Sequence, residues 1–159
     1  MLLVLTFLLS TAFPSTTSTG WMRPESFRLA IGMSRSEAMA AIENGGWDPK
    51  EGRTPDEVIL DYTGERSVTL EFRRNRLRSI RFELFLTLDK IKAAFEEERS
   101  FLRKELGAPR KTLLAGKVLL YDDKLPNVMV VLSNDPKSEN GRKGIGFIAV
   151  RYYDPAYVK

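Results

Sequence analysis

The sequence predicts an α+β fold, with one antiparallel sheet of about six strands and two helices packed on one face. Two segments, residues 35–44 and 88–106, repeat apolar residues at the three-to-four spacing of a helix. Several segments around them alternate apolar and polar residues, which is typical of strands that are buried on one side. With 159 residues, the chain is long enough for a single domain with a sizeable core.

The start and end of the first helix are marked by capping residues. Ser34 and Glu37 have the spacing of a capping box, in which each side chain satisfies a backbone N–H of the first turn. Gly45 and Gly46 indicate where this helix ends. The apolar residues of one face are Ala38, Met39 and Ile42. A helix of about ten residues is not stable alone in water, so we expect it to pack against the sheet.

The second helix is longer and has Thr87 as its expected N-cap. Its apolar residues recur at steps of three, four or seven: Leu88, Ile91, Phe95, Leu102 and Leu106. Charged residues occupy the opposite face, and Gly107 followed by Pro109 predicts the end of the helix.

Six segments read as strands. Three precede the second helix, at 57–63, 68–73 and 77–84, and three follow it, at 117–121, 127–133 and 144–154. Between them, residues 47–56 and 134–143 read as polar loops, and the glycines of residues 141–146 as a hairpin turn. Residues 21–31 form either a short strand or an irregular approach to the first helix.

One break in the alternation predicts a β-bulge. Leu77 and Ile80 are three residues apart, so a regular strand would point them to opposite faces. An extra residue near Arg78 lets both side chains face the core. Asn75, in the preceding turn, tolerates a left-handed backbone conformation.

Composition limits the chemistry that the chain can perform. It has neither His nor Cys, which excludes a thiol nucleophile, an imidazole base, a disulfide and a conventional zinc site. Catalysis would have to rest on Ser, Lys, Asp, Glu or Tyr. We therefore expect a protein that is not an enzyme and that uses no cofactor and no metal.

The first twenty residues are typical of a secretory signal peptide. Residues 2–13 are almost entirely apolar but too short to span a bilayer comfortably, and residues 14–20 are small and polar. Cleavage near residue 12 or residue 20 would satisfy the small-residue rule, leaving residues 21–159 as the folded domain. No Lys or Arg precedes Leu2, so an uncleaved anchor or a buried strand is the alternative. The segment predicts a periplasmic or secreted protein.

The sheet face away from the helices is the candidate partner-binding surface. Arginine and aromatic side chains on such a face are typical of interface anchors, although ordinary half-exposed sheets carry them too. The candidates are Thr69, Glu71, Arg73, Arg81, Met129, Arg151 and Tyr153.

A basic concentration surrounds the hairpin between the second and third strands. It contains Arg73, Arg74, Arg76, Arg78 and Arg81, and Arg110 and Lys111 follow later in the chain. These side chains either bind an acidic partner or an anion, or shield a sheet edge and pair with Glu71 and Glu83 across the strands. The predicted export of the protein argues against nucleic acid as the partner.

For three further features we predict a structural role rather than a binding role. Trp47 covers the end of the first helix rather than stacking on a ligand. The carboxylates Asp122 and Asp123, and Asp135 with Glu139, lack the alternating spacing of a calcium loop and read as turn residues.

Residues 31–37, Ile-Gly-Met-Ser-Arg-Ser-Glu, resemble the opening of SmpA/OmlA (BamE-like) domains and the motif that opens the repeats of β-lactamase inhibitor protein. The resemblance is strongest over residues 31–86. It implies two tandem modules of a helix and three strands, about 32–86 and 87–154, in exported bacterial proteins that bind other proteins. In this reading Gly32, Ser34 and Glu37 are structural residues. The chain lacks the lipid-attachment Cys of the first family and the disulfides of the second, so neither family's activity carries over.

We therefore expect an exported, non-catalytic protein-interaction or envelope-associated module, with another envelope or secreted protein as its partner. One alternative is an anion-ligand carrier or small enzyme that holds a carboxylate or phosphate with Arg81 or Arg151. The other is a purely structural accessory domain.

Overall fold

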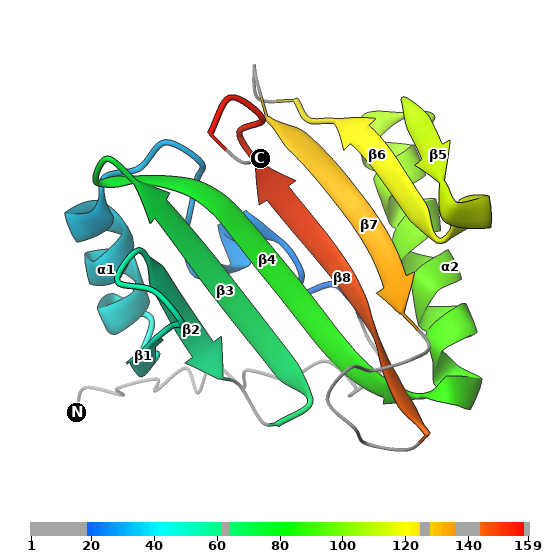
Figure 1. The fold of residues 1–159 in the computed structure, drawn as a ribbon, viewed down its shortest axis with the longest axis horizontal. Coiled ribbons are helices and arrows are strands. Elements are labelled where there is room, and N and C mark those ends of the chain that lie inside the picture. Colours follow the sequence, from blue (N-terminus) through cyan, green and yellow to red (C-terminus); the bar gives the residue numbers. More distant parts are fainter. Residues whose placement is uncertain (1–18, 62–63, 125–127, 136–143, 158–159) are drawn as a thin grey trace, which may run out of the picture.

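The computed structural model describes residues 19–61, 64–124, 128–135 and 144–157. They form one antiparallel sheet of eight strands, in the order β1-β2-β3-β4-β8-β7-β6-β5, with two α-helices (Figure 1). The predicted α+β class is confirmed, but the predicted number of about six strands was too low. Residues 1–18 of the predicted signal peptide, and residues 136–143 of the predicted loop and turn, lie outside the described residues.

The helices and strands follow one another along the chain in two runs. The first run contains α1 (Arg35–Asn44), β1 (Pro49–Glu51), β2 (Glu57–Asp61), β3 (Arg66–Arg73) and β4 (Arg76–Thr87). The second contains α2 (Leu88–Leu106), β5 (Lys111–Leu113), β6 (Val118–Asp122), β7 (Met129–Asp135) and β8 (Ile145–Tyr153). Short 3₁₀ helices, η1 (Pro24–Phe27) and η2 (Leu114–Gly116), complete the order.

The two additional strands, β1 and β5, have three residues each. Strand β1 lies inside the predicted loop 47–56, so that prediction was wrong for its first part. Three residues are too few to show an alternating pattern, and a proline begins β1. Both strands exist because a longer neighbour supplies the hydrogen-bonding partner: β2 pairs with β1, and β6 with β5.

Helix α1 begins as the sequence predicts. The Glu37 backbone N–H donates to Ser34 Oγ at 3.2 Å, and the Ser34 backbone N–H donates to Glu37 Oε2 at 2.8 Å. Ala38 and Ile42 are buried against the sheet. The helix ends before Gly45, and the next residue, Gly46, has a φ of +76° that a side chain would disfavour.

Helix α2 has the predicted bounds, but one residue of its predicted apolar face differs from expectation. Leu88, assigned to the apolar face, is 48% exposed, whereas Glu98 is completely buried. Thr87 is the N-cap residue, but its side chain makes no capping hydrogen bond to the helix backbone. Gly107 follows the last turn with a φ of +90°, where only glycine is free of strain.

The predicted bulge is present in β4. Glu71 pairs with Ser79 and Phe72 pairs with Leu77, so Arg78 is the extra residue between them. Leu77 and Ile80 are both completely buried. The turn before β4 places both Arg74 and Asn75 in the left-handed region, with φ values of +51° and +61°.

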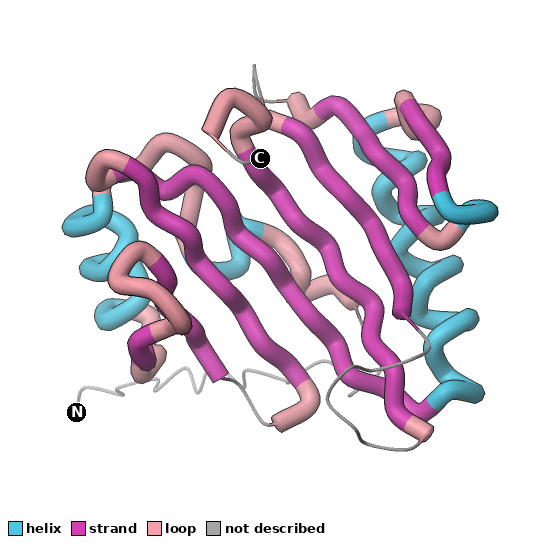
Figure 2. Tube along the Cα trace, in the orientation of Figure 1, coloured by secondary structure: helices cyan, strands magenta, loops and turns pink. Residues whose placement is uncertain are grey.

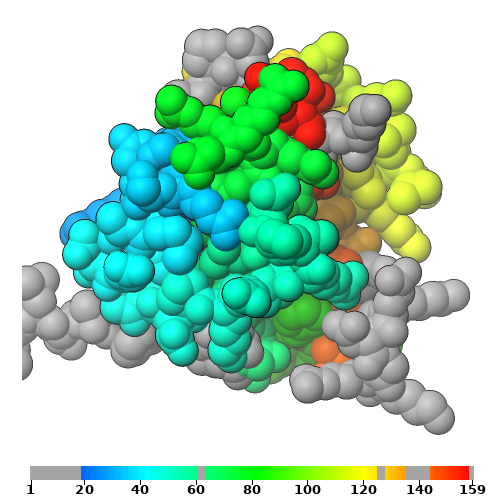
Figure 3. Space-filling view, turned by 60° about the vertical axis from the view of Figure 1, so that its left-hand side comes forward, coloured from blue at the N-terminus to red at the C-terminus, as the bar shows by residue number. Residues whose placement is uncertain are grey.

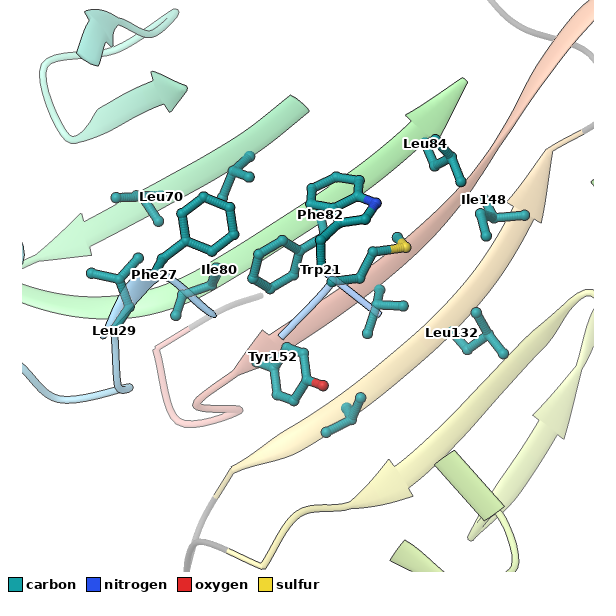
Figure 4. Packing of buried hydrophobic residues seen from close by; sticks show 14 of the residues in the cluster. Trp21, Phe27, Leu29, Leu70, Ile80, Phe82, Leu84, Leu132, Ile148 and Tyr152 are labelled. Carbon is teal, nitrogen blue, oxygen red and sulfur yellow. The ribbon is translucent and has the colours of Figure 1, made fainter. Parts of the chain in front are cut away.

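One face of the sheet carries the core. Buried side chains from both helices and from alternate positions of the strands belong to a single cluster, so α1 and α2 cover the same face. Figure 1 and Figure 2 show both helices behind the sheet. The segment before α1 also packs there: η1 places Phe27, and the preceding turn places Trp21, on either side of Phe82 (Figure 4).

The two runs meet in the middle of the sheet, where β4 pairs with β8. Each run has four strands after its helix rather than the predicted three. That the runs are two copies of one module stays a prediction.

Candidate functional site

The side of the sheet that faces away from α1 and α2 is called the open face here. Its side chains alternate with the buried core residues along the six longer strands, whereas β1 and β5 have no buried residue. The strand register places the predicted candidates other than Arg73 in two neighbouring rows. One row runs Glu71, Ser79, Tyr153, Met129, and the next runs Thr69, Arg81, Arg151, Val131.

Arg151 is the centre of a polar network on the open face. Its Nε donates to Ser79 Oγ at 2.8 Å, and its guanidinium donates to Glu71 Oε2 at 2.8 Å. The guanidinium also lies 5.4 Å from the centre of the Tyr153 ring. Tyr153 in turn directs its hydroxyl to the sulfur of Met129, at 3.8 Å. Four predicted candidates are thus brought together, and the positive charge of Arg151 is matched by Glu71.

Arg81 makes a looser pair with Glu83 on the same strand. Its Nε lies 3.5 Å from Glu83 Oε1. Burial raises the pKa of the Glu83 carboxyl, and the positive charge of Arg81 opposes that shift. Because two-fifths of the Arg81 side chain stays exposed, its guanidinium is available to a partner on the open face.

The basic hairpin is arranged differently from the sequence prediction. Strands β3 and β4 are internal, so their arginines shield no sheet edge. Arg78 pairs with Asp154 at 3.1 Å and lies over the Tyr157 ring, rather than pairing with Glu71 or Glu83. Arg76 donates to the Gly32 carbonyl at 3.1 Å. Arg73 is exposed at the end of β3, outside the Arg151 network.

Beside the polar network lies a strip of half-buried apolar side chains, which we call the apolar strip. Phe85 and Phe147 face each other there with ring centres 6.0 Å apart. The strip has two parts, which Ala149 and Ser133 separate: the pair Phe85 and Phe147, and the group Val118, Leu120, Met129 and Val131. Apart from Met129, none of these residues was predicted from the sequence as a candidate. The available signal was that 127–133 and 144–154 are apolar at both alternating positions.

The remaining singled-out residues have local roles. Trp47 packs on the core, with its ring 5.0 Å from that of Phe27, and a Cβ at Gly45 would collide with it. Asp122 lies 3.3 Å from Arg110 in an exposed pair, and Asp123 accepts the Lys124 backbone N–H at 2.7 Å. Within the described ranges, no three acidic side chains come together as metal ligands would.

A cleft of about 670 Å³ lies on another side of the molecule, where α1 meets the β1–β2 segment (Figure 3). It is open to solvent and lined by both cations and anions, among them Arg35, Lys50, Arg53 and Glu57. Arg35 already donates to the Pro55 carbonyl at 2.9 Å, and Glu57 accepts the Arg53 backbone N–H at 2.7 Å. These bonds brace the β1–β2 loop.

No protein-family model, no curated protein and no solved structure matches this chain. Among the helices that the structure describes, none combines the length and the apolar character needed to cross a membrane.

Proposed function

We propose that this chain is an exported, non-catalytic protein-interaction module that binds an envelope or secreted protein through the open face. The observation that carries the proposal is the apolar strip beside the Arg151 network. Apolar side chains that gather, only partly buried, on one face of a folded domain are typical of binding surfaces. Arginine and tyrosine next to them supply donors and contact area at a low entropic cost.

The Arg151 network supports recognition because it is held in place. Arg151 is fixed by Ser79, Glu71 and the Tyr153 ring, so a partner that contacts these groups orders few side chains. Arg81 is the more available cation of the open face, and we assign it the role of contacting a carboxylate of the partner.

The alternative function, an anion carrier or a small enzyme, is less favoured. Of the two arginines that a carrier would use, Arg151 is already neutralised by Glu71, which leaves Arg81 alone to hold the ligand. The absence of His and Cys in the sequence argues in the same direction for catalysis. The localisation in this proposal rests on the apolar residues 2–13 of the sequence.

Crosslinking from a single position tests the proposal, because the chain has no native Cys. Val131→Cys carries a photoreactive group on the open face, and Lys92→Cys carries it on the exposed side of α2 as the matched control. In an envelope extract we expect one protein to crosslink to position 131 and none to position 92. Adding Arg81→Glu should weaken that product.

Equal crosslinking from both positions, or none from position 131, would contradict binding through the open face. A melting temperature that rises with phosphate or citrate and no longer rises in Arg81→Glu would favour the anion carrier instead.

A further inference from the structure

The hairpin between β5 and β6 carries two leucines that are exposed to solvent. Leu114 is 73% exposed and Leu113 is 38% exposed, and Leu114 is the most exposed large apolar residue that the structure describes. Both lie at the turn, where β5 passes through η2 into β6. Two adjacent leucines at the tip of a hairpin add nothing to the core of the domain.

The backbone of this turn is held in an unfavourable conformation. Leu114, Ala115 and Gly116 have consecutive φ values of +50°, +53° and +87°. Only glycine adopts this region without steric cost, so the first two residues are strained. Folding of the isolated domain does not bury Leu114 in return for this strain, which points to a contact made outside the chain.

The charges nearest to the leucines in sequence have one sign, and the acidic residues Asp122 and Asp123 come at the far end of β6. Residues 110–121 contain three cations, Arg110, Lys111 and Lys117, and no Asp or Glu. Lys111 and Lys117 are exposed and form no ion pair within the described part of the chain. The Arg110 guanidinium forms an ion pair with Asp122 Oδ1 at 3.3 Å. The hairpin therefore presents an apolar tip between basic flanks.

The hairpin also lies where a flat surface can reach it. Strand β5 is the last strand of the sheet, and Figure 2 shows the hairpin and η2 at the rim of the molecule. An apolar tip with basic flanks at a rim matches the chemistry of a bilayer surface, whose headgroups are anionic and whose interior is apolar.

We propose that the β5–β6 hairpin docks on a bilayer that contains anionic phospholipids. Leu113 and Leu114 enter the boundary between headgroups and acyl chains, and Lys111 and Lys117 lie among the phosphates. A peptide added along β5 is the weaker interpretation, because β5 offers only three residues for main-chain pairing. The docking surface borders the open face, because Leu113 and Lys111 pair with Val118 and Leu120 of the apolar strip. The tip label at position 115 and the crosslinker at position 131 report on the two activities separately.

A fluorescent label tests insertion in the full chain. An environment-sensitive dye is attached to Ala115→Cys at the tip, and to Ala93→Cys on the exposed side of α2 as the control. Vesicles of phosphatidylglycerol and phosphatidylcholine should shift the emission of the tip label to the blue and leave the control label unchanged. If residues 2–13 alone attach the chain, both labels stay in water, which would overturn the proposal.

Substitutions in the labelled Ala115→Cys chain separate the apolar contribution of the leucine from the electrostatic contribution of the lysine. Leu114→Ser should weaken insertion of the tip into the vesicles about tenfold, as followed by the emission of the tip label. The reason is that most of a leucine's transfer free energy is lost. Leu88→Ser, at the exposed leucine of α2, should change nothing. Lys117→Gln should weaken insertion about fivefold in low salt and much less in high salt.

Two outcomes would sink the assignment. One is an equal blue shift with pure phosphatidylcholine, because the lysines would then have no role. The other is an insertion that Leu114→Ser and Leu88→Ser weaken to the same extent.

Discussion

Arg23 and Glu98 illustrate how single residues hold this fold together. Glu98 is completely buried on α2, and the Arg23 guanidinium donates to its Oε2 at 2.9 Å and lies 2.8 Å from its Oε1. Arg23 also lies over the Phe101 ring at 3.8 Å. The pair ties the segment before η1 to α2. No sequence pattern predicts this pair, because a glutamate among the charged residues of an amphipathic helix is ordinarily exposed.

Arg23→Met is expected to lower the free energy of unfolding by about 3–5 kcal/mol, because Glu98 would be left as a buried carboxyl without its cation. The double variant Arg23→Met with Glu98→Leu should recover most of that loss, since no charge is then buried. Denaturant unfolding of the two single variants and the double variant measures the coupling. A double variant as unstable as Arg23→Met alone would contradict this account.

The pH dependence of stability should carry the signature of Glu98. Burial raises the pKa of its carboxyl above the value in the unfolded chain, while Arg23 opposes the shift and Glu97 adds to it. The folded protein therefore holds more protons than the unfolded chain. This contribution to stability is complete below the unfolded pKa and is lost as pH rises through the folded one.

Glu98→Gln should accordingly flatten the fall in stability above pH ~4.5, as followed by thermal unfolding across a pH series. Burial raises the pKa of the Glu83 carboxyl as well. Glu83→Gln therefore measures how much this residue of the open face contributes to the same fall in stability. A pH profile that is unchanged in Glu98→Gln would show that Glu98 does not titrate differently on folding.

The two helices differ in how their first turns are capped. Ser34 caps α1 through a hydrogen bond from the Glu37 backbone, whereas the Thr87 side chain makes no such bond at α2. Both residues were assigned as N-caps from the same sequence preference. The preference identifies where a helix begins, but the rotamer that forms the bond depends on the neighbouring structure.

Ser34→Ala should reduce the free energy of unfolding by about 1 kcal/mol, because an N–H of the first turn loses its acceptor. Thr87→Ala is the matched control, and a loss of only a few tenths of a kcal/mol is expected there. Chemical denaturation of both variants gives the comparison. Equal losses at the two positions would mean that the capping bond of α1 contributes nothing of its own.

In the whole molecule, strand order is the property that local sequence patterns do not specify. The hairpins β2–β3 and β3–β4 follow from short turns between alternating segments. The pairing of β4 with β8 joins residues 79–87 to residues 145–153, and no local pattern specifies such a distant pair. Its consequence is that β3 and β4 lie inside the sheet, which corrected the interpretation of the basic hairpin as an edge.

The same pairing assembles the candidate site. Glu71, Arg151 and Met129 come from β3, β8 and β7, and alternation alone placed them on the open face. Which of them touch was decided by register: Arg151 reaches Glu71 and Ser79 across two strand interfaces, while Arg73 stays apart at the end of β3.

Local sequence patterns suffice to predict the α+β class, the extents of both helices, the capping box and the bulge at Arg78. Each of these depends on residues within a few positions of one another, where spacing alone fixes the geometry. Tertiary structure decided the strands β1 and β5, the burial of Glu98, the apolar strip and the exposed leucines of the β5–β6 hairpin. These features exist because segments distant in the chain supply, or fail to supply, the partner that a local pattern leaves open.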